Sequence, residues 1–432
     1  MGSDGGSRAE ARPRSLLGRI LIDVRPLRIR EFRRLWTTTA VTAVGGQLSA
    51  VAVPKQVYDI TGSSGWVGLT GAVGLVALIV FGLWGGAISD AFDRRTVMIV
   101  SGMGLGITSA LLWLQAFAGL ASVWVILVLL GVQQACLAVN GPARNAAIPR
   151  LVPVDLVPQA NALGFTVFMF GMVFGPLAAG ALIPVLGLST LYLIDTVALF
   201  LAQIPLFLLP AMPPGTGTST GAGIRDILAG FRYMATKNVL LASFVIDLIA
   251  MVAGLPRALF PEMAQHTFGD PPGGGLALGL LYAAMPIGAV LGGLFSGSVS
   301  RLPRQGVVVT FAVILWGAAV IAFGFSTALL LAVLFLAIGG AADLVSAIHR
   351  NAILQTAATD EMRGRMQGAF TVVVSGGPRI ADLLHGWAAT TIGTAATTII
   401  GGTLVIILTI IAVALLPAFW RHIAPTETTP TP

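Results

Sequence analysis

The sequence predicts an all-α membrane protein in which twelve transmembrane helices form two six-helix pseudo-symmetric halves. Three observations support this fold class. The chain of 432 residues is 56% hydrophobic and only 10% charged, with a mean hydropathy of +0.90, so it carries more apolar surface than a water-soluble protein can bury. Apolar segments of about 20 residues, the length of helix that crosses a bilayer, recur along the whole chain. Basic residues cluster in alternate connections between those segments.

Twelve apolar segments are long enough to cross a bilayer as helices. A connection rich in Gly, Pro, Ser and Thr, residues 210–223, divides them into two sets of six and has the composition of a flexible linker. We therefore expect a basic N-terminal segment (1–34), an N-terminal half (35–210), a linker (211–237), a C-terminal half (238–417) and a tail (418–432). The twelve predicted spans are residues 35–57, 66–88, 96–117, 122–143, 161–183, 188–210, 238–262, 276–299, 306–326, 328–349, 366–390 and 394–417.

The basic residues predict which side of the membrane each connection faces. All but three of the 25 Lys and Arg residues lie before the first span, in every second connection or in the tail; the exceptions are Lys55, Arg257 and Arg379. Cytoplasmic connections are enriched in Lys and Arg, so both termini are expected in the cytoplasm, which requires an even number of spans. The net charge of +7 is thus a topology signal and gives no support to nucleic-acid binding.

A repeat relates the two predicted halves. The triplet Arg-Asn-Ala occurs at residues 144–146 and again at 350–352, each time at the cytoplasmic end of a span. Parallel six-helix repeats occur in alternating-access transporters, which bind their substrate at the interface of the halves near the bilayer midplane.

A short, charged connection joins the second and third predicted spans. Residues 86–95 read Gly-Ala-Ile-Ser-Asp-Ala-Phe-Asp-Arg-Arg, and in them Gly86, Asp90, Arg94 and Arg95 resemble the signature loop of the major facilitator superfamily. Ala91 and Asp93 depart from its pattern at a basic and a glycine position. The second half carries only a degraded copy of this loop, from Gly292 to Arg301.

Other segments are similar to the drug:proton antiporter branch of that superfamily, which includes the enterobactin (siderophore) exporters. The resemblance implies the major facilitator fold and export of a siderophore-like or amphipathic small molecule across the inner membrane, most simply by proton-coupled alternating access. A general multidrug efflux pump remains an alternative, as do a solute importer and a non-transporting membrane receptor. The similar segments are residues 32–36, 51–54, 61–64, 228–232, 280–289 and 361–365.

Two further features follow from the resemblance. Gly175, Pro176 and Gly180 resemble the glycine-proline motif in the fifth span of exporters, a helix-packing element that favours export over uptake. The signature loop implies a cytoplasmic gate, in which Asp90 engages the start of the eleventh span near Arg365 when the inner side is closed. The gate candidates are Gly86, Asp90, Asp93, Arg94, Arg95, Arg144, Arg350 and Arg365.

The residues give little support to an enzyme. The four histidines and the single Cys136 lack metal-ligand spacing, and neither lysine, Lys55 or Lys237, sits in an ATP-binding P-loop. We therefore expect no catalytic residue, metal, ATP or other cofactor, and a proton gradient as the energy source. The expected partners are a small-molecule substrate and the lipid bilayer, with the protein acting as a monomer.

Ionisable residues at membrane depth are candidates for proton coupling. Asp247 lies near the middle of the seventh span, where a lone buried carboxylate can take up and release protons; a permanently hydrogen-bonded structural role is the alternative. Arg379, Asp382 and His385 share one face of the eleventh span. They form a proton relay, an anion-attracting patch, or a neutralised intrahelical ion pair. Asp195 in the sixth span is expected to be structural.

Amide side chains are the candidates for the cavity wall and the substrate site: Gln47 in the first span, and Gln133, Gln134 and Asn140 in the fourth. A cavity of amides, glycines and aromatic residues suits a bulky, largely neutral, hydrogen-bonding ligand. The buried arginine common in the fourth span of proton-driven antiporters is expected to be missing, because Arg144 lies just beyond residues 122–143. Proton coupling would then depend on Asp247 and the eleventh span.

Overall fold

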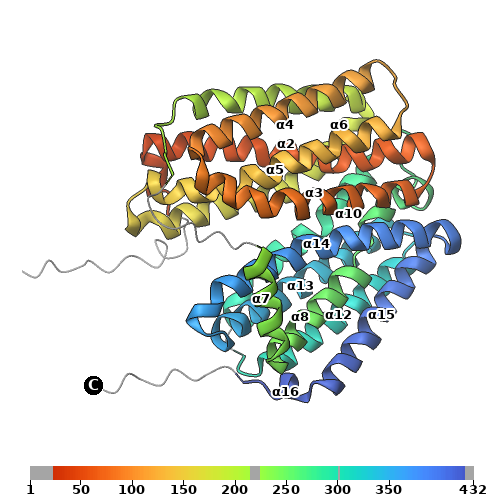
Figure 1. Cartoon of the computed structure of the whole chain (residues 1–432). Coiled ribbons are helices and arrows are strands. Elements are labelled where there is room, and N and C mark those ends of the chain that lie inside the picture. Colours follow the sequence, from red (N-terminus) through yellow and green to blue (C-terminus); the bar gives the residue numbers. More distant parts are fainter. Residues whose placement is uncertain (1–22, 215–223, 300–301, 424–432) are drawn as a thin grey trace, which may run out of the picture.

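The computed structural model of the protein describes residues 23–214, 224–299 and 302–423. In these ranges the regular secondary structure is entirely helical. The helices form two bundles that lie side by side, one from each half of the sequence (Figure 1). Nine of the helices in the described ranges are long and apolar enough to cross a membrane. The all-helical, multi-span fold class expected from hydropathy is confirmed.

The first bundle contains five long helices. The longest of them is bent at Gly187, whose φ of 77° marks the point where two helical arms meet. A positive φ is readily adopted only by glycine, so this residue permits the chain to turn back between the fifth and sixth predicted spans. The elements are η1 (Arg25–Arg28), α2 (Arg30–Thr61), α3 (Ser64–Ala91), α4 (Arg94–Phe117), α5 (Val123–Leu151), η2 (Val154–Leu156) and α6 (Val157–Phe207).

The second bundle repeats this plan with more interruptions. Short helices lie at its ends and between its long ones. The elements are α7 (Ile224–Ala235), α8 (Asn238–Ala253), η3 (Arg257–Leu259), α9 (Phe260–His266), α10 (Leu276–Leu294), α11 (Ser296–Val299), α12 (Gln305–Phe325), α13 (Leu329–Ala357), α14 (Asp360–Ile392), α15 (Thr394–Leu415) and α16 (Pro417–Trp420).

The seventh predicted span, residues 238–262, falls within a segment long and apolar enough to cross a membrane (Asn238–His266), but its helix is interrupted. Helix α8 ends at Ala253, and the chain resumes as η3 only at Arg257. Gly254 and Pro256 cause the break. Pro256 restricts the residue before it and cannot donate a backbone hydrogen bond, and any side chain on Gly254 would collide with Trp316. The break brings Arg257 to the inner face of the bundle, where it lines a cavity.

The two bundles touch closely at one end, where α2 stops and α3 starts; we call it the Ser64 end. Here α3 packs on α14, with Gly68 against Asp382 and Gly386, and α6 packs on α10 through Gly180 and Gly279. A Cβ added to Gly180 would lie 2.7 Å from the Gly279 Cα. Small residues permit such close approach of helices. Toward the opposite end, where α3 stops and α4 starts (the Arg94 end), the bundles diverge (Figure 1).

Candidate functional site

A cavity of about 770 Å³ lies between the two bundles. Its wall includes α2, α3, α5 and α6 from the first bundle and α8, α10, α13 and α14 from the second. The volume falls within the range of small-molecule binding pockets. Apolar side chains such as Phe168, Met169 and Met172 line one side. This interface cavity is the candidate site.

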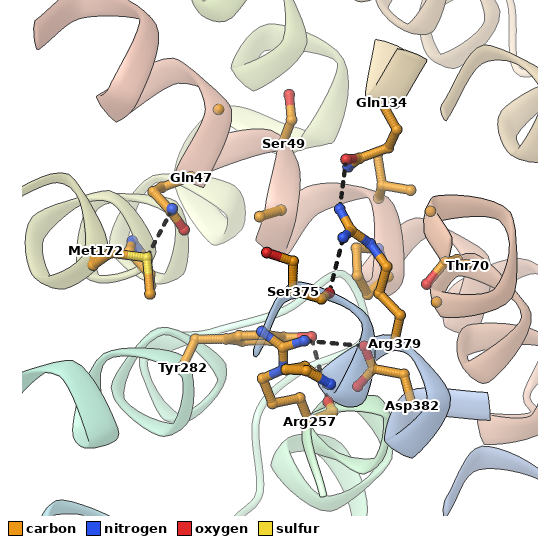
Figure 2. A pocket seen from close by; sticks show the side chains of 18 of the residues that line it. Gln47, Ser49, Thr70, Gln134, Met172, Arg257, Tyr282, Ser375, Arg379 and Asp382 are labelled. Atoms are coloured by element: carbon orange, nitrogen blue, oxygen red, sulfur yellow. Dashed lines mark hydrogen bonds and ion pairs between the residues drawn. The ribbon is translucent and has the colours of Figure 1, made fainter. Parts of the chain in front are cut away.

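Arg379 crosses this cavity and connects the bundles. From α14 its Nη2 donates to Gln134 Oε1 of α5 at 3.1 Å, and its Nη1 donates to the Ser375 carbonyl at 3.0 Å (Figure 2). Gly74 of α3 makes room for it, because a Cβ there would lie 2.8 Å from Arg379 Nε. A single guanidinium group therefore forms a polar link between the halves within the substrate-sized space.

Asp382 pairs with Arg257, not with Arg379. The Arg257 Nη2 to Asp382 Oδ2 distance is 3.1 Å, and the Tyr282 hydroxyl donates to the Arg257 carbonyl at 3.4 Å (Figure 2). The intrahelical pair considered for the eleventh span is not among the ion pairs of the described residues, because the break after α8 brings a second arginine within reach. Two guanidinium groups and one carboxylate give this cluster a net positive charge.

The amide candidates divide into two groups. Gln47, Gln133 and Gln134 line the cavity, and Gln47 Nε2 lies 2.9 Å from Met172 Sδ (Figure 2). Asn140 lies elsewhere, inside the first bundle, where its Nδ2 donates to Ser101 Oγ at 2.8 Å. The cavity wall thus combines amides and apolar groups with charged side chains, which the expectation of a largely neutral ligand did not take into account.

Asp247 is buried, as the sequence predicted. It is not a lone carboxylate, however, because an arginine lies close to it. Its Oδ1 lies 2.8 Å from Arg350 Nη2, and the same nitrogen lies 3.6 Å from Asp343 Oδ1. The Asp247 and Arg350 side chains are only 1% and 3% exposed, whereas Asp343 is 33% exposed and lines the cavity. Arg350, expected at a gate, is enclosed because α13 continues to Ala357, beyond the predicted end of the span at 349.

Arg144 is a buried arginine of the fourth span, so the expectation that this group was missing was wrong. Helix α5 continues to Leu151 and carries Arg144 inside the first bundle. Its Nε donates to Asn140 Oδ1 at 2.5 Å, and its Nη1 donates to the hydroxyls of Thr38 and Thr39 at 3.0 and 2.9 Å. The misplaced helix end, not the composition, caused the error.

His385 does not line the cavity. It is 6% exposed and lies against Gly401 of α15, where an added Cβ would come within 3.3 Å of His385 Nε2. Of the exporter-like motif, Pro176 lines the cavity, Gly175 makes room for Gln47, and Gly180 forms the contact with α10 described above.

The signature loop fastens the Arg94 end of the first bundle. Asp93 caps α4 by accepting from the Thr96 amide at 3.0 Å, and its other oxygen accepts from the Met212 amide at 2.7 Å. Arg95 donates to the Phe207 carbonyl at the end of α6 at 2.6 Å, as cations near helix C-termini do. Asp93 and Arg95 therefore hold the start of α4 against the end of α6 and the segment that follows it, a role that the motif alone did not indicate.

The remaining gate candidates are Gly86, Asp90, Arg94 and Arg365. Gly86 has open space around it, and Asp90 is half-buried at the end of α3. Arg94 hydrogen-bonds through its amide to the Met212 carbonyl at 3.1 Å. Arg365 lies in the second turn of α14, with its Nη1 at 3.7 Å from Met362 Sδ. Arg301, in the degraded copy of the loop, lies outside the described residues.

Charged groups also meet at the Ser64 end. Ser64 Oγ donates to Glu262 Oε2 at 2.5 Å and joins the two bundles, while Lys55 pairs with Asp59 within α2. The sequence did not place Arg257 in the cavity. The Gly-Leu-Pro break at 254–256 was the signal that could have done so.

The chain is similar to known transport proteins along most of its length. A profile of the transmembrane secretion effector family matches residues 23–431. The enterobactin exporter EntS of Citrobacter koseri is 30% identical over 382 residues, covering 87% of this chain and 89% of that protein. The EntS protein of Shigella boydii serotype 18 is 31% identical over 366 residues, covering 82% and 84%.

Solved structures agree on the fold. A bacterial homologue of the human lysosomal transporter Spinster, in an inward-facing and unoccupied conformation, aligns with a TM-score of 0.68 at 15% identity and covers 92% of this chain and 97% of its own. The nucleoside transporter NupG aligns with a TM-score of 0.67 at 13% identity and covers 90% of this chain and 98% of its own. The chain is therefore a multi-pass membrane protein that belongs to the transmembrane secretion effector family of the major facilitator superfamily.

Proposed function

We propose that this protein is an alternating-access exporter of the bacterial inner membrane that moves a siderophore-like, amphipathic small molecule out of the cytoplasm. The observation that carries the proposal is the cavity between the halves, crossed by the link from Arg379 to Gln134. The curated relatives at 30% and 31% identity are named as enterobactin exporters and align over most of both chains.

The proposed topology has twelve spans and cytoplasmic termini. Helix α6 supplies two spans through its bend at Gly187, and α2 and α14, each over 30 residues long, add two to the helices that meet the apolar criterion. The positive-inside rule assigns the Arg94 end to the cytoplasm. Because the halves touch at the Ser64 end and diverge at the Arg94 end (Figure 1), this state is inward-facing.

The cavity chemistry supports an acidic, partly aromatic substrate. The cluster of Arg257, Arg379 and Asp382 carries a net positive charge, and guanidinium groups bind oxygen anions in fork geometry. Phe168 and Met172 supply apolar contact surface. A molecule with several acidic hydroxyl or carboxyl groups on an aromatic frame matches both features, whereas a cationic drug would be repelled.

Secretion by a deletion strain tests this function. Under iron limitation we expect the strain to retain in its cytoplasm a catecholate or carboxylate siderophore that the parent strain secretes, with unchanged susceptibility to cationic drugs. An identical secretion profile together with increased drug susceptibility would favour the general multidrug pump instead. Secretion should return when the gene is restored.

Proton coupling is proposed at the carboxylates of the second bundle. Asp247→Asn and Asp382→Asn are each expected to abolish stimulation of efflux by a pH gradient in membrane vesicles. The reason is that each carboxylate exchanges an arginine partner for a proton as the cavity alternates. Asp155→Asn, at an exposed position in η2, is the matched control. Full gradient-driven activity in both the Asp247→Asn and the Asp382→Asn variant would exclude these carboxylates from coupling.

The signature loop is proposed to act when the inner side closes. Asp90→Ala is expected to slow turnover several-fold while leaving substrate affinity largely unchanged, because Asp90 lies at the end of α3 and not on the cavity wall. Comparing the transport rate with equilibrium binding of the same substrate measures both effects. Loss of substrate binding in this variant would contradict a role of Asp90 that is confined to the cytoplasmic gate.

A further inference from the structure

Asp195 is a buried carboxyl group that the proposed mechanism does not yet use. It lies in the second arm of α6, is 1% exposed and still lines the cavity. Its Oδ2 accepts hydrogen bonds from Ser49 Oγ of α2 at 2.9 Å and Ser109 Oγ of α4 at 2.8 Å. Its Oδ1 has no hydrogen-bond partner and faces Gly45, where any side chain would collide with it. The group therefore joins three helices at the cavity wall.

Asp195 differs from the other carboxylates near the cavity in having no cation. Asp247, Asp343 and Asp382 each lie within 4 Å of an arginine nitrogen. No Lys or Arg of the described ranges lies within ion-pair distance of Asp195. The nearby groups are hydroxyls and backbone: Gly45 and Ser49 from α2, Ser109 from α4, and Tyr192 and Thr196 from α6.

The buried cations that contact α2 are engaged elsewhere. Arg144 binds Asn140 and the hydroxyls of Thr38, Thr39 and Thr42, all of them more than a helical turn away from Ser49. Lys55 pairs with Asp59 near the Ser64 end of the same helix. Neither forms an ion pair with Asp195.

An ionised carboxylate without a cation is costly in a buried site, whereas a neutral carboxylic acid is much less so. We propose that Asp195 is a proton-binding site of the transport cycle, in addition to the carboxylates of the second bundle. In the inward-facing, empty state its carboxyl group is protonated. When substrate enters, the O–H bond breaks, the proton passes to water in the cavity, and the carboxylate keeps its two hydroxyl donors on Oδ2.

The position of Asp195 gives this proton an effect on conformation. Its donors Ser49 and Ser109 belong to α2 and α4, and the other arm of its own helix makes the Gly180–Gly279 contact with the second bundle. Ionisation strengthens the hydrogen bonds to Oδ2, since bonds to a charged acceptor are stronger than neutral ones. Packing among α2, α4 and α6 is thereby coupled to protonation. The inference rests on the proposed export function only for its place in the cycle.

Infrared spectroscopy of the full-length protein in lipid nanodiscs tests the proton site without any substrate. We expect the wild type to show a carboxylic acid C=O band that disappears as the pH of the buffer is raised, and Asp195→Asn to lack that band. Asp155→Asn is the control and should retain it. A wild-type spectrum in which Asp195 contributes no titrating band, or an Asp195→Asn spectrum that keeps the band unchanged, would overturn the proposal.

A second variant keeps the test decisive if Asp195→Asn does not fold. Ser109→Ala removes one donor to Oδ2 but leaves the acid in place, so the same band is expected to titrate with a displaced midpoint. An unchanged midpoint would count against Asp195 as the origin of the band. Thr108→Ala, on the preceding residue of α4, bonds only to helix carbonyls and serves as its control.

Transport in proteoliposomes tests the place of the proton in the cycle, with enterobactin as the probe. Asp195→Asn is expected to lose at least tenfold of the stimulation of enterobactin exchange by a pH gradient. Gradient stimulation equal to wild type would contradict the proposal. If wild-type protein does not move enterobactin, the proposed function fails, while the infrared experiment still decides whether Asp195 binds a proton.

Discussion

Gly68→Leu is expected to stop transport by holding the halves apart at the Ser64 end. A Cβ at Gly68 of α3 would lie 2.5 Å from the Asp382 carbonyl oxygen and 3.2 Å from the Gly386 Cα. Both are backbone atoms of α14 and cannot turn aside as a side chain can. The inward-facing contact therefore cannot form with a leucine in place, and the protein should accumulate in a state that is open at the Ser64 end.

Distances between spin labels measure this shift directly. In a Cys136→Ser background, labels at Leu120 and Ile392 report on the Ser64 end, and labels at Val154 and Leu302 report on the Arg94 end; all four positions are exposed. The first distance is expected to lengthen and the second to shorten in the variant.

A matched glycine provides the control for this shift. Gly164→Leu should leave both distances unchanged, because an added Cβ there meets nothing within 4 Å. Wild-type distances and wild-type transport in Gly68→Leu would contradict the inward-facing arrangement.

Arg350→Met is expected to cause the largest loss of stability. Arg350 is 3% exposed and lies beside two carboxylates, Asp247 at 2.8 Å and Asp343 at 3.6 Å. Removing the cation leaves Asp247, itself 1% exposed, as a buried and unpaired charge. Breaking a buried ion pair by removing one partner costs about 3–5 kcal/mol. The variant should unfold at a markedly lower temperature in detergent, or fail to accumulate in the membrane.

A double variant separates this charge effect from lost packing. Arg350→Met combined with Asp247→Asn removes both buried charges, so it should recover much of the lost thermal stability. Asp343 remains in the double variant but is 33% exposed and lines the cavity, where water can solvate it. A melting temperature of the single variant equal to that of wild type would show that the cluster of Asp247, Asp343 and Arg350 does not stabilise the second bundle.

Hydropathy was sufficient to predict most of the long helices but not their ends. Apolar length is a property of the sequence alone, so spans such as 96–117 and 394–417 correspond closely to α4 (Arg94–Phe117) and α15 (Thr394–Leu415). A hydropathy criterion does not detect the polar residues that continue a helix beyond its apolar stretch. For this reason α5 and α13 ran past their predicted ends and enclosed Arg144 and Arg350.

The pairing of charges could not be predicted, because it depends on contacts between distant segments. Arg379 and Asp382 share a helix face, and sequence spacing alone suggested a local pair. The structure instead pairs Asp382 with Arg257, 125 positions away in sequence, and Arg379 with Gln134, 245 positions away. The first pairing depends on the break after α8, and the second on the room that Gly74 of α3 leaves for Arg379.

The part of the site that sequence reasoning did find is the part set by residue type. Gln47, Gln133 and Gln134 line the cavity because polar side chains in spans turn away from lipid. The same rule applied to Asp195, which was expected to be structural. Only the geometry shows that it lacks a cation and lies at the cavity wall.

Uptake of enterobactin into inside-out proteoliposomes tests the central claim, that an acidic small molecule is exported through the cavity between the halves. Wild-type protein is expected to accumulate the probe against its gradient when the vesicle interior is acidic. Arg379→Gln, which removes the cation that crosses the cavity, is expected to reduce accumulation at least tenfold at equal protein content. No accumulation by wild type, or equal accumulation by Arg379→Gln, would contradict the account.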